Sequence, residues 1–311
     1  MDAKLVEQIT KLVVEALADG DGSSTQASSE RFIAITNENR SVASRNEPFF
    51  ERFRKGEKEH SVGADNGQTV ELVETIEEKF ENARSKTPAR IGVGRTGSRP
   101  LTATMLKFRY DHAAAVDSVY GEVNEELLKK LDLFTIHTKV ENDADTYILR
   151  PDLGRKLTDE AKKVLQERCN KNPQVQIIVS NGLSAEAINA NLENVYRSFL
   201  QSLEKLGLST GTPFYIEKGR VGLMDDIGEL LQPDVVVYLI GERPGLVTAE
   251  SMSAYICYQP RHSTIESDRT VVSNIHKGGI PPVEAGAFLG TVIEKILRYK
   301  ASGVNLVKLE E

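Results

Sequence analysis

The sequence predicts an α/β fold in which helices flank a largely parallel sheet, with a flexible N-terminal extension. Segments that favour strands alternate with segments of helical periodicity through the second half of the chain, as in successive βαβ units. Residues Val235 to Ile240 form an apolar run that is typical of a parallel strand covered on both faces. We therefore expect a folded body over residues 70–311, with a helical part to about residue 170 and a Rossmann-like part over 171–311.

The individual elements follow from hydrophobic periodicity and from the residues that break it. Helical periodicity begins at Val70–Arg84, and a short strand at Arg90–Val93 leads through a glycine-rich turn into a long helix at Leu101–Tyr120. Further strands or extended segments are expected at Leu133–Val140, Tyr147–Leu149, Val175–Ser180, Pro213–Glu217, Val235–Ile240 and Ala254–Tyr258. Further helices are expected at Asp159–Cys169, Ala185–Leu206, Met224–Leu231 and Val283–Lys300.

The first 69 residues differ from this body in composition. Residues 1–20 carry apolar side chains at helical spacing from Leu5 to Leu17, which predicts one amphipathic helix. Residues 21–69 are polar and weakly periodic, so we expect a poorly ordered linker. A helix this short needs a surface to pack on. That surface is either its own domain or another protein, which the helix would bind as a tethered peptide.

Composition excludes several classes of protein. The chain has 311 residues, of which 40% are hydrophobic and 27% charged, and its formal net charge is −7. We expect no binding to membranes, because no apolar run approaches the roughly 20 residues that span a bilayer and no signal peptide opens the chain. We expect no binding to nucleic acid, because the excess charge is acidic. Two cysteines are too few for a disulfide framework or a cysteine-rich zinc site.

The segment Gly92–Gly97 matches the pattern G-x-G-x-x-G. In a dinucleotide site such glycines bring a pyrophosphate onto a helix N-terminus. Here the preceding strand is short, and Arg99 and Pro100 separate the glycines from the helix body. The pattern therefore favours a glycine-rich turn that positions Arg95 and Arg99, where they would hold an anionic group. A nucleotide-dependent oxidoreductase built on these glycines is kept as an alternative.

A second segment, from Asn274 to Gly279, is one residue short of the motif D-x-H-x-x-G. That motif marks cobalamin proteins whose histidine binds cobalt, and its aspartate raises the basicity of the imidazole. Asn274 carries no such charge, so His276 is expected to be a hydrogen-bonded loop residue. No metal-binding histidine pair, serine nucleophile elbow or activated cysteine is visible, and we predict no catalytic residue and no metal ligand.

Glu242 follows the apolar strand Val235–Ile240 directly. The carboxyl ends of parallel strands are where open α/β sheets bind their ligands. Glu242 is therefore expected either to face a ligand or to interact simply with its neighbour Arg243 or with solvent.

Seven motifs occur in an order that is found in one known family. They are GRTGSRP (94–100), RPDLGRKL (150–157), VSNGLSAEAI (179–188), GTPFYIEKGRV (211–221), IGERPGL (240–246), SDRTVVSNIHKGGIPPVEA (267–285) and KASGVNL (300–306). With these motifs, the chain from about residue 91 onward resembles the small (light) subunit of ethanolamine ammonia-lyase, an adenosylcobalamin-dependent enzyme.

The resemblance implies a carbon–nitrogen lyase that converts ethanolamine to acetaldehyde and ammonia by a radical mechanism. The family's large subunit, a TIM-type barrel, supplies the substrate site, while the small subunit completes the cobalamin cleft in a hexamer of heterodimers. The resemblance also implies base-on cobalamin, in which the lower benzimidazole stays on cobalt. Three cobalamin-associated positions of the family correspond to Val221, Glu242 and Val271. Some relatives have cysteine at the third position.

The same resemblance implies a role for the amphipathic helix expected at residues 1–20. Enzymes of ethanolamine utilisation commonly reside in bacterial microcompartments, and short amphipathic N-terminal helices direct cargo into them. Residues 2–18 are therefore expected to bind the shell or cargo of a microcompartment. A non-catalytic microcompartment adaptor is kept as a further alternative.

Overall fold

The computed structural model describes residues 80–87, 89–140 and 144–310, which belong to two compact units. Residues 80–104 fall in one unit and residues 105–310 in the other, and each is described by itself. The expected amphipathic helix at residues 1–20, the linker at 21–69 and the start of the body at residue 70 lie outside the described residues. Of the helix expected at Val70–Arg84, residues 80–84 are described and are helical, and the helix continues to residue 86.

Residues 80–104 contain a small hairpin that includes part of the glycine-rich segment Gly92–Gly97. Strands β1 (Arg95–Thr96) and β2 (Arg99–Pro100) pair antiparallel in a two-stranded sheet of their own. The strand expected at Arg90–Val93 is wrong: this segment is a turn in which Gly92 has φ 60°. The Arg84 guanidinium donates to the carbonyls of Ile91 and Gly92 at 2.8 and 2.7 Å and so holds the turn.

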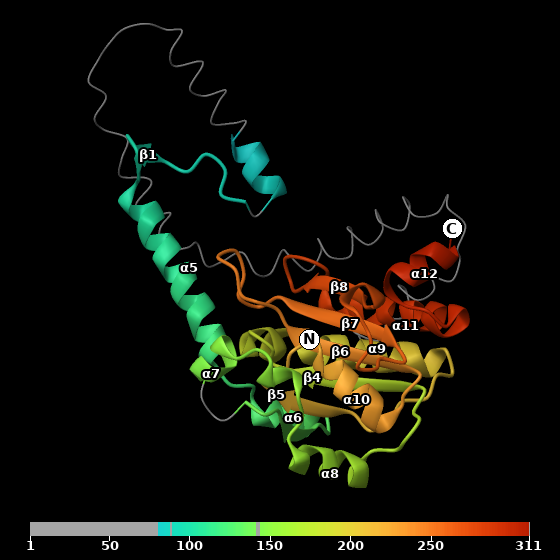
Figure 1. Ribbon diagram of the computed structural model, residues 1–311. Helices are drawn as coiled ribbons and strands as arrows, with labels where there is room; N and C mark the ends of the chain where they lie inside the picture. The colour runs from blue at the N-terminus through green and yellow to red at the C-terminus, as the bar shows by residue number, and fades with distance from the viewer. Residues whose placement is uncertain (1–79, 88, 141–143, 311) are drawn as a thin grey trace, which may run out of the picture. The chain divides into compact units, whose positions relative to one another are not determined.

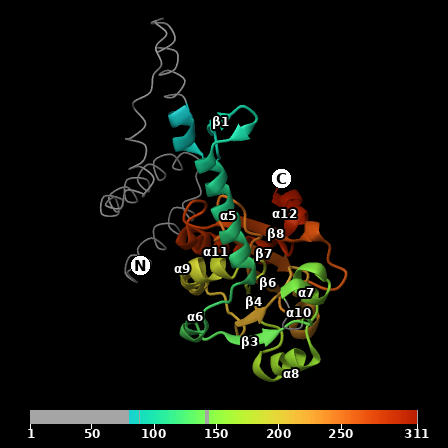
Figure 2. The same cartoon turned by 90° about the vertical axis from the view of Figure 1, so that its left-hand side faces the viewer.

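A six-stranded sheet forms the centre of residues 105–310 (Figure 1). Its order is β3-β5-β4-β6-β7-β8, and the strands labelled in Figure 2 run from β3 near the bottom through β4, β6 and β7 to β8. The first four strands in this order are parallel, whereas β7 runs antiparallel to both of its neighbours. The predicted α/β class with a largely parallel sheet is confirmed. The strands are β3 (Phe134–His137), β4 (Val175–Ser180), β5 (Phe214–Glu217), β6 (Val235–Gly241), β7 (Met252–Tyr258) and β8 (Thr270–Ile275).

The helices confirm most expectations and correct one. The strand expected at Tyr147–Leu149 is wrong, because these residues end helix α7 (Ala144–Leu149), where Tyr147 is buried. Only Tyr147 of these three apolar residues is buried, whereas Ile148 and Leu149 are exposed, so the short apolar run does not mark a strand. The other helices are α5 (Thr102–Tyr120), α6 (Glu125–Lys130), α8 (Asp159–Arg168), α9 (Ala185–Lys205), α10 (Leu223–Leu231), α11 (Pro282–Tyr299) and α12 (Gly303–Glu310), with 3-10 turns η2 (Leu153–Arg155) and η3 (Glu266–Asp268).

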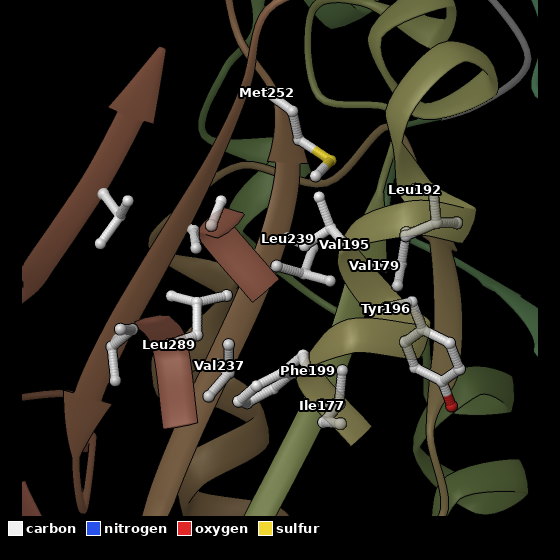
Figure 3. Packing of buried hydrophobic residues seen from close by; sticks show 14 of the residues in the cluster. Ile177, Val179, Leu192, Val195, Tyr196, Phe199, Val237, Leu239, Met252 and Leu289 are labelled. Carbon is white, nitrogen blue, oxygen red and sulfur yellow. The ribbon is translucent and has the colours of Figure 1, made fainter. Parts of the chain in front are cut away.

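Two apolar clusters cover the two faces of the sheet. One cluster lies between the sheet and helices α9 and α11, and the other lies between the sheet and helices α8 and α10. Helix α9 begins at its cap Ser184, whose hydroxyl accepts the Ala187 N–H at 3.0 Å, a standard way to satisfy a free amide of the first turn. Figure 3 shows its apolar side chains against the strands, with Leu192, Val195 and Phe199 near Ile177, Val179, Val237 and Leu239.

Helices α9 and α11 approach closely because their contact is built from small residues. A Cβ added at Gly286 or Gly290 would overlap atoms of α9. Ser198 and Ser202 of α9 donate their hydroxyls to the carbonyls of Val283 and Ala287 at 2.7 and 3.0 Å. Helices α9 and α11 therefore cover this face of the sheet closely.

Candidate functional site

The chain leaves two adjacent parallel strands toward opposite faces of the sheet. From β4 it passes to α9, and from β5 it passes to α10 on the other face. Such a switch point opens a crevice at the carboxyl ends of the strands. A cavity of about 180 Å³ lies at this edge. It is lined by Tyr147, Gly182, Leu183, Arg220, Val221, Ile240, Gly241, Glu242, Arg243, Ser253 and Tyr255.

The first expected residue, Val221, belongs to the loop after β5. The end of β4 fixes this loop: Asn181 Oδ1 accepts the Lys218 N–H at 2.8 Å, and Ser180 Oγ accepts the Gly219 N–H at 3.0 Å. Val221 is half-buried, packs beside the apolar cluster under α10 and lines the cavity. It therefore offers apolar surface to a ligand.

Glu242, the second expected residue, lies directly after β6 and also lines the cavity. One carboxylate oxygen, Oε1, accepts the Ser253 hydroxyl at 2.5 Å and the Asn274 N–H at 2.8 Å. No ion pair between Glu242 and Arg243 occurs within the described residues. Of the two expectations for Glu242, pairing with Arg243 is therefore wrong, and its other oxygen, Oε2, has no described protein partner.

Val271 lies on the edge strand β8, directly opposite Tyr255 of β7. Tyr255 lines the cavity, and Val271 is 44% exposed beside it. Burial raises the pKa of Tyr255, and the Glu242 carboxylate adds to that rise, so the phenol stays protonated and can donate a hydrogen bond. The structure thus brings the three expected residues together, Val221 and Glu242 in the cavity wall and Val271 next to it.

Sequence reasoning missed two further lining residues, Tyr147 and Arg220. The Arg220 guanidinium lies 4.1 Å from the Tyr147 ring centroid and donates from Nη2 to the Tyr147 carbonyl at 2.8 Å. The Tyr147 hydroxyl donates to the Gly219 carbonyl at 2.9 Å, and burial raises its pKa. Arg220 belongs to the motif GTPFYIEKGRV (211–221), but Tyr147, which orients it, is 73 positions away in the chain. No local pattern therefore indicates their contact.

The interpretation of His276 as a hydrogen-bonded loop residue is supported by its contacts. Its Nδ1 accepts the Gly278 N–H at 3.1 Å, which requires the proton to sit on Nε2. Nε2 then donates to Asn274 Oδ1 at 2.8 Å. Both ring nitrogens are therefore engaged within the loop.

A larger cavity of about 840 Å³ opens at the same edge, over β3 and β5. Tyr147 lines both cavities. The charged groups in the larger one are largely paired among themselves, because Glu217 lies 3.2 Å from His137 Nδ1 and 3.4 Å from Lys218 Nζ. The smaller cavity holds the less compensated charges.

The chemistry of the described residues is that of a binding wall. They contain no cluster of three or more His, Cys, Asp or Glu residues that could hold a metal ion. Burial raises the pKa of Cys169 and of Cys257 to about 11, so neither thiol is activated. No helix among them is both long and apolar enough to cross a membrane. A carboxylate, a guanidinium, a phenol and apolar surface together suit recognition of a polar ligand.

Comparison with known proteins identifies the family of this chain. Residues 77–307 match the family described as ethanolamine ammonia-lyase light chain (EutC). The chain belongs to this family. It is 52% identical over 232 residues to the ethanolamine ammonia-lyase small subunit of Fusobacterium nucleatum, covering 75% of this chain and 78% of the relative. The small subunits of Clostridium tetani and Lachnoclostridium phytofermentans are 52% and 50% identical over 229 residues, or 74% of this chain and 77% of theirs.

Membership in the light-chain family confirms the resemblance of the seven motifs. The glycine-rich segment Gly92–Gly97 takes no part in the six-stranded sheet, since it contributes to the separate β1–β2 hairpin. A dinucleotide site needs a strand that leads through the glycines into a helix. The arrangement observed therefore argues against an oxidoreductase built on these glycines.

Proposed function

We propose that this chain is the small subunit of an adenosylcobalamin-dependent ethanolamine ammonia-lyase and forms one wall of its cobalamin cleft. In this function ethanolamine is converted to acetaldehyde and ammonia by a radical mechanism. The observation that carries the proposal is the convergence of Val221, Glu242 and Val271 at one edge of the sheet. These residues lie in a loop after β5, a loop after β6 and the edge strand β8.

The residues fit a corrin as a wall and not as an enclosure. A cavity of about 180 Å³ is far smaller than a corrin with its amide side chains, so most of the cofactor would lie outside it. Val221 and Val271 would pack on the corrin rim. Glu242 would accept hydrogen bonds from corrin amides through Oε2, while Oε1 stays bound to Ser253 and Asn274. A second polypeptide, the large subunit, would complete the cleft and supply the substrate site.

The cofactor and the protein would have different tasks in this function. The bound cofactor would supply the radical chemistry, and the protein would supply orientation and seclusion from water. Glu242 is held by two donors and can therefore fix the orientation of an amide without moving itself. His276 is engaged with Asn274 and Gly278 and would leave the lower benzimidazole on cobalt, in the base-on form.

The assembly and location follow from the same proposal. We expect the chain to pair with the large subunit in a hexamer of heterodimers and to reside in a bacterial microcompartment, to which residues 2–18 would direct it. Deletion of residues 1–20 should abolish encapsulation and leave lyase activity intact. Normal encapsulation of the truncated chain would remove the targeting role from this segment.

Titration with adenosylcobalamin tests the proposed function. The purified chain, the large subunit and their mixture are each titrated, and ethanolamine deamination is measured in parallel. Tight binding and turnover are expected only in the mixture. Turnover by this chain alone would overturn the proposal. Normal turnover by the large subunit alone would instead favour the non-catalytic adaptor, and NADH binding by this chain would favour the oxidoreductase.

A further inference from the structure

Arg220 is a half-buried cation in the wall of the 180 Å³ cavity, and no carboxylate of the described residues forms an ion pair with it. Its hydrogen-bond partner is a neutral group, the Tyr147 carbonyl, at 2.8 Å. Its Nε is buried and has no hydrogen-bond partner. Because a charge withdrawn from water is normally paired with an opposite charge, this guanidinium lacks the group that would compensate it.

The Arg220 side chain is also held in place before any ligand arrives. The Tyr147 ring lies against one face of the guanidinium, with the ring centroid 4.1 Å from its central carbon. The backbone N–H of Arg220 donates to the Gly154 carbonyl at 2.8 Å. A Cβ added at Gly154 would overlap the Lys218 carbonyl and the Arg220 side chain, so this close approach depends on glycine. A fixed guanidinium loses little entropy when it binds an anion.

The charges around the cavity select the kind of group that Arg220 would bind. Glu242 is already engaged through Oε1 with neutral donors and does not neutralise Arg220. Lys218, two residues before Arg220, is paired with Glu217 at 3.4 Å. Arg243 also lines the cavity, but this residue is exposed to water. Arg220 is therefore the half-buried, uncompensated cation of the cavity wall, and guanidinium groups bind phosphate oxygens especially well.

We propose that Arg220 binds the phosphodiester of the nucleotide loop of cobalamin. This inference rests on the proposed function, in which the same cavity contacts the cofactor. The phosphodiester is the anionic group of that cofactor's periphery, whereas the corrin side chains are neutral amides. Arg220 and Glu242 then divide the recognition: the guanidinium binds the phosphate, and the carboxylate binds the amides.

Two cofactor fragments isolate the phosphate. Adenosylcobinamide lacks the whole nucleotide loop, and adenosylcobinamide phosphate retains the phosphate without the base. The assembled complex of this chain with the large subunit is titrated with each fragment and with adenosylcobalamin, and binding is followed by the visible spectrum. The wild-type complex should bind adenosylcobinamide phosphate more tightly than adenosylcobinamide.

Arg220→Gln should remove that difference. We expect its Kd for adenosylcobalamin and for adenosylcobinamide phosphate to rise by about 10- to 100-fold, while its Kd for adenosylcobinamide changes by less than about twofold. Arg220→Lys, which keeps the charge, should retain part of the preference. Arg155→Gln is the matched control, because Arg155 is an exposed arginine that packs beside Gly222 and does not line the cavity. It should retain the wild-type preference.

Each contrary result has a separate meaning. Equal losses for all three ligands in Arg220→Gln would make Arg220 a structural residue and overturn the inference while leaving the proposed function intact. Loss of subunit association at unchanged cofactor affinity, measured by sedimentation, would assign the compensating anion to the large subunit and also overturn it. Failure of the wild-type complex to bind adenosylcobalamin would overturn the proposed function itself.

Discussion

Glu242 accepts the backbone N–H of Asn274 at 2.8 Å and thereby connects the end of β6 to the end of β8, although β7 lies between these strands. Asn274 has φ 63°, a left-handed conformation that asparagine tolerates better than most residues. Its side chain accepts a hydrogen bond from His276 at 2.8 Å. One carboxylate thus joins the cavity wall to the loop that holds His276.

Substitution of Glu242 should affect the cofactor more than the fold. Glu242→Ala removes the acceptor that faces the cavity, and we expect a loss of about 1–3 kcal/mol in adenosylcobalamin binding, or a rise in Kd of roughly 5- to 150-fold. Glu242→Gln keeps the oxygen that serves Asn274 and should lose less. Spectroscopic titration of the assembled complex measures both.

Ser253→Ala is the control for this prediction. It removes one donor to Glu242 Oε1 and leaves the carboxylate in place. Its cofactor affinity should fall less than that of Glu242→Ala, because the Asn274 N–H still holds the carboxylate. If Glu242→Ala binds adenosylcobalamin as tightly as the wild type, Glu242 does not belong to the cofactor wall.

The central sheet could be predicted from the sequence because its strands and helices carry strong periodicity. The expected strand at Val175–Ser180 matches β4, and the expected helix at Ala185–Leu206 differs from α9 by one residue at its end. The edge strand β8 was not assigned, since only two of its six residues, Val272 and Ile275, are buried. Its apolar residues do not alternate strictly with polar ones, so the pattern of a half-buried strand is incomplete.

The site could be predicted only as separate positions. Val221, Glu242 and Val271 came from the resemblance to a family, and their closeness depends on the order of β5, β6, β7 and β8 in the sheet. Arg220 could not be chosen from local sequence, because its orientation depends on Tyr147 and Gly154, which come from an earlier part of the chain. Tertiary contacts of this kind leave no periodic signal.

The RPDLGRKL motif contributes to stability through a buried carboxylate of α10. Asp226 accepts the Leu157 N–H at 3.0 Å and lies 3.1 Å from both Lys156 Nζ and His262 Nε2. Asp226→Ala leaves the buried Leu157 N–H without a partner, so we expect a loss of about 1–3 kcal/mol in the free energy of unfolding, measured with denaturant. Asp152→Ala, at an exposed carboxylate of the same motif, should change the midpoint little.

Gly182 occupies a position that no other residue fits without strain. It has φ 52°, and an added Cβ would overlap the Gly241 carbonyl and the Ile240 side chain. We expect Gly182→Ala to lower the free energy of unfolding by about 3 kcal/mol, from the left-handed conformation and from overpacking together. Gly207 has φ 68° with open space around it, so Gly207→Ala should cost only about 1 kcal/mol. Equal losses in the two variants would contradict the close contact at Gly182.

The two native cysteines should resist thiol reagents in the folded protein. Cys169 and Cys257 are 7% and 1% exposed, and burial raises the pKa of each to about 11. At pH 8 only about one thiol in a thousand is then ionised, and the thiolate is the species that reacts. Reaction with Ellman's reagent should be slow at pH 8, faster at pH 10 and complete in guanidinium chloride. Rapid labelling at pH 7 would show that these thiols are not shielded.

Because Cys169 and Cys257 should react slowly, a thiol introduced at position 271 can be labelled selectively. Val271→Cys is therefore a direct probe of the cofactor wall. Val271 is 44% exposed on an edge strand, so cysteine there should leave the free energy of unfolding nearly unchanged and add one fast-reacting thiol. Labelling is compared in the assembled complex with and without adenosylcobalamin, which separates protection by the cofactor from protection by the large subunit. Protection that depends on adenosylcobalamin is expected, because the corrin rim would cover this residue. A labelling rate that the cofactor does not change would exclude position 271 from the cofactor wall.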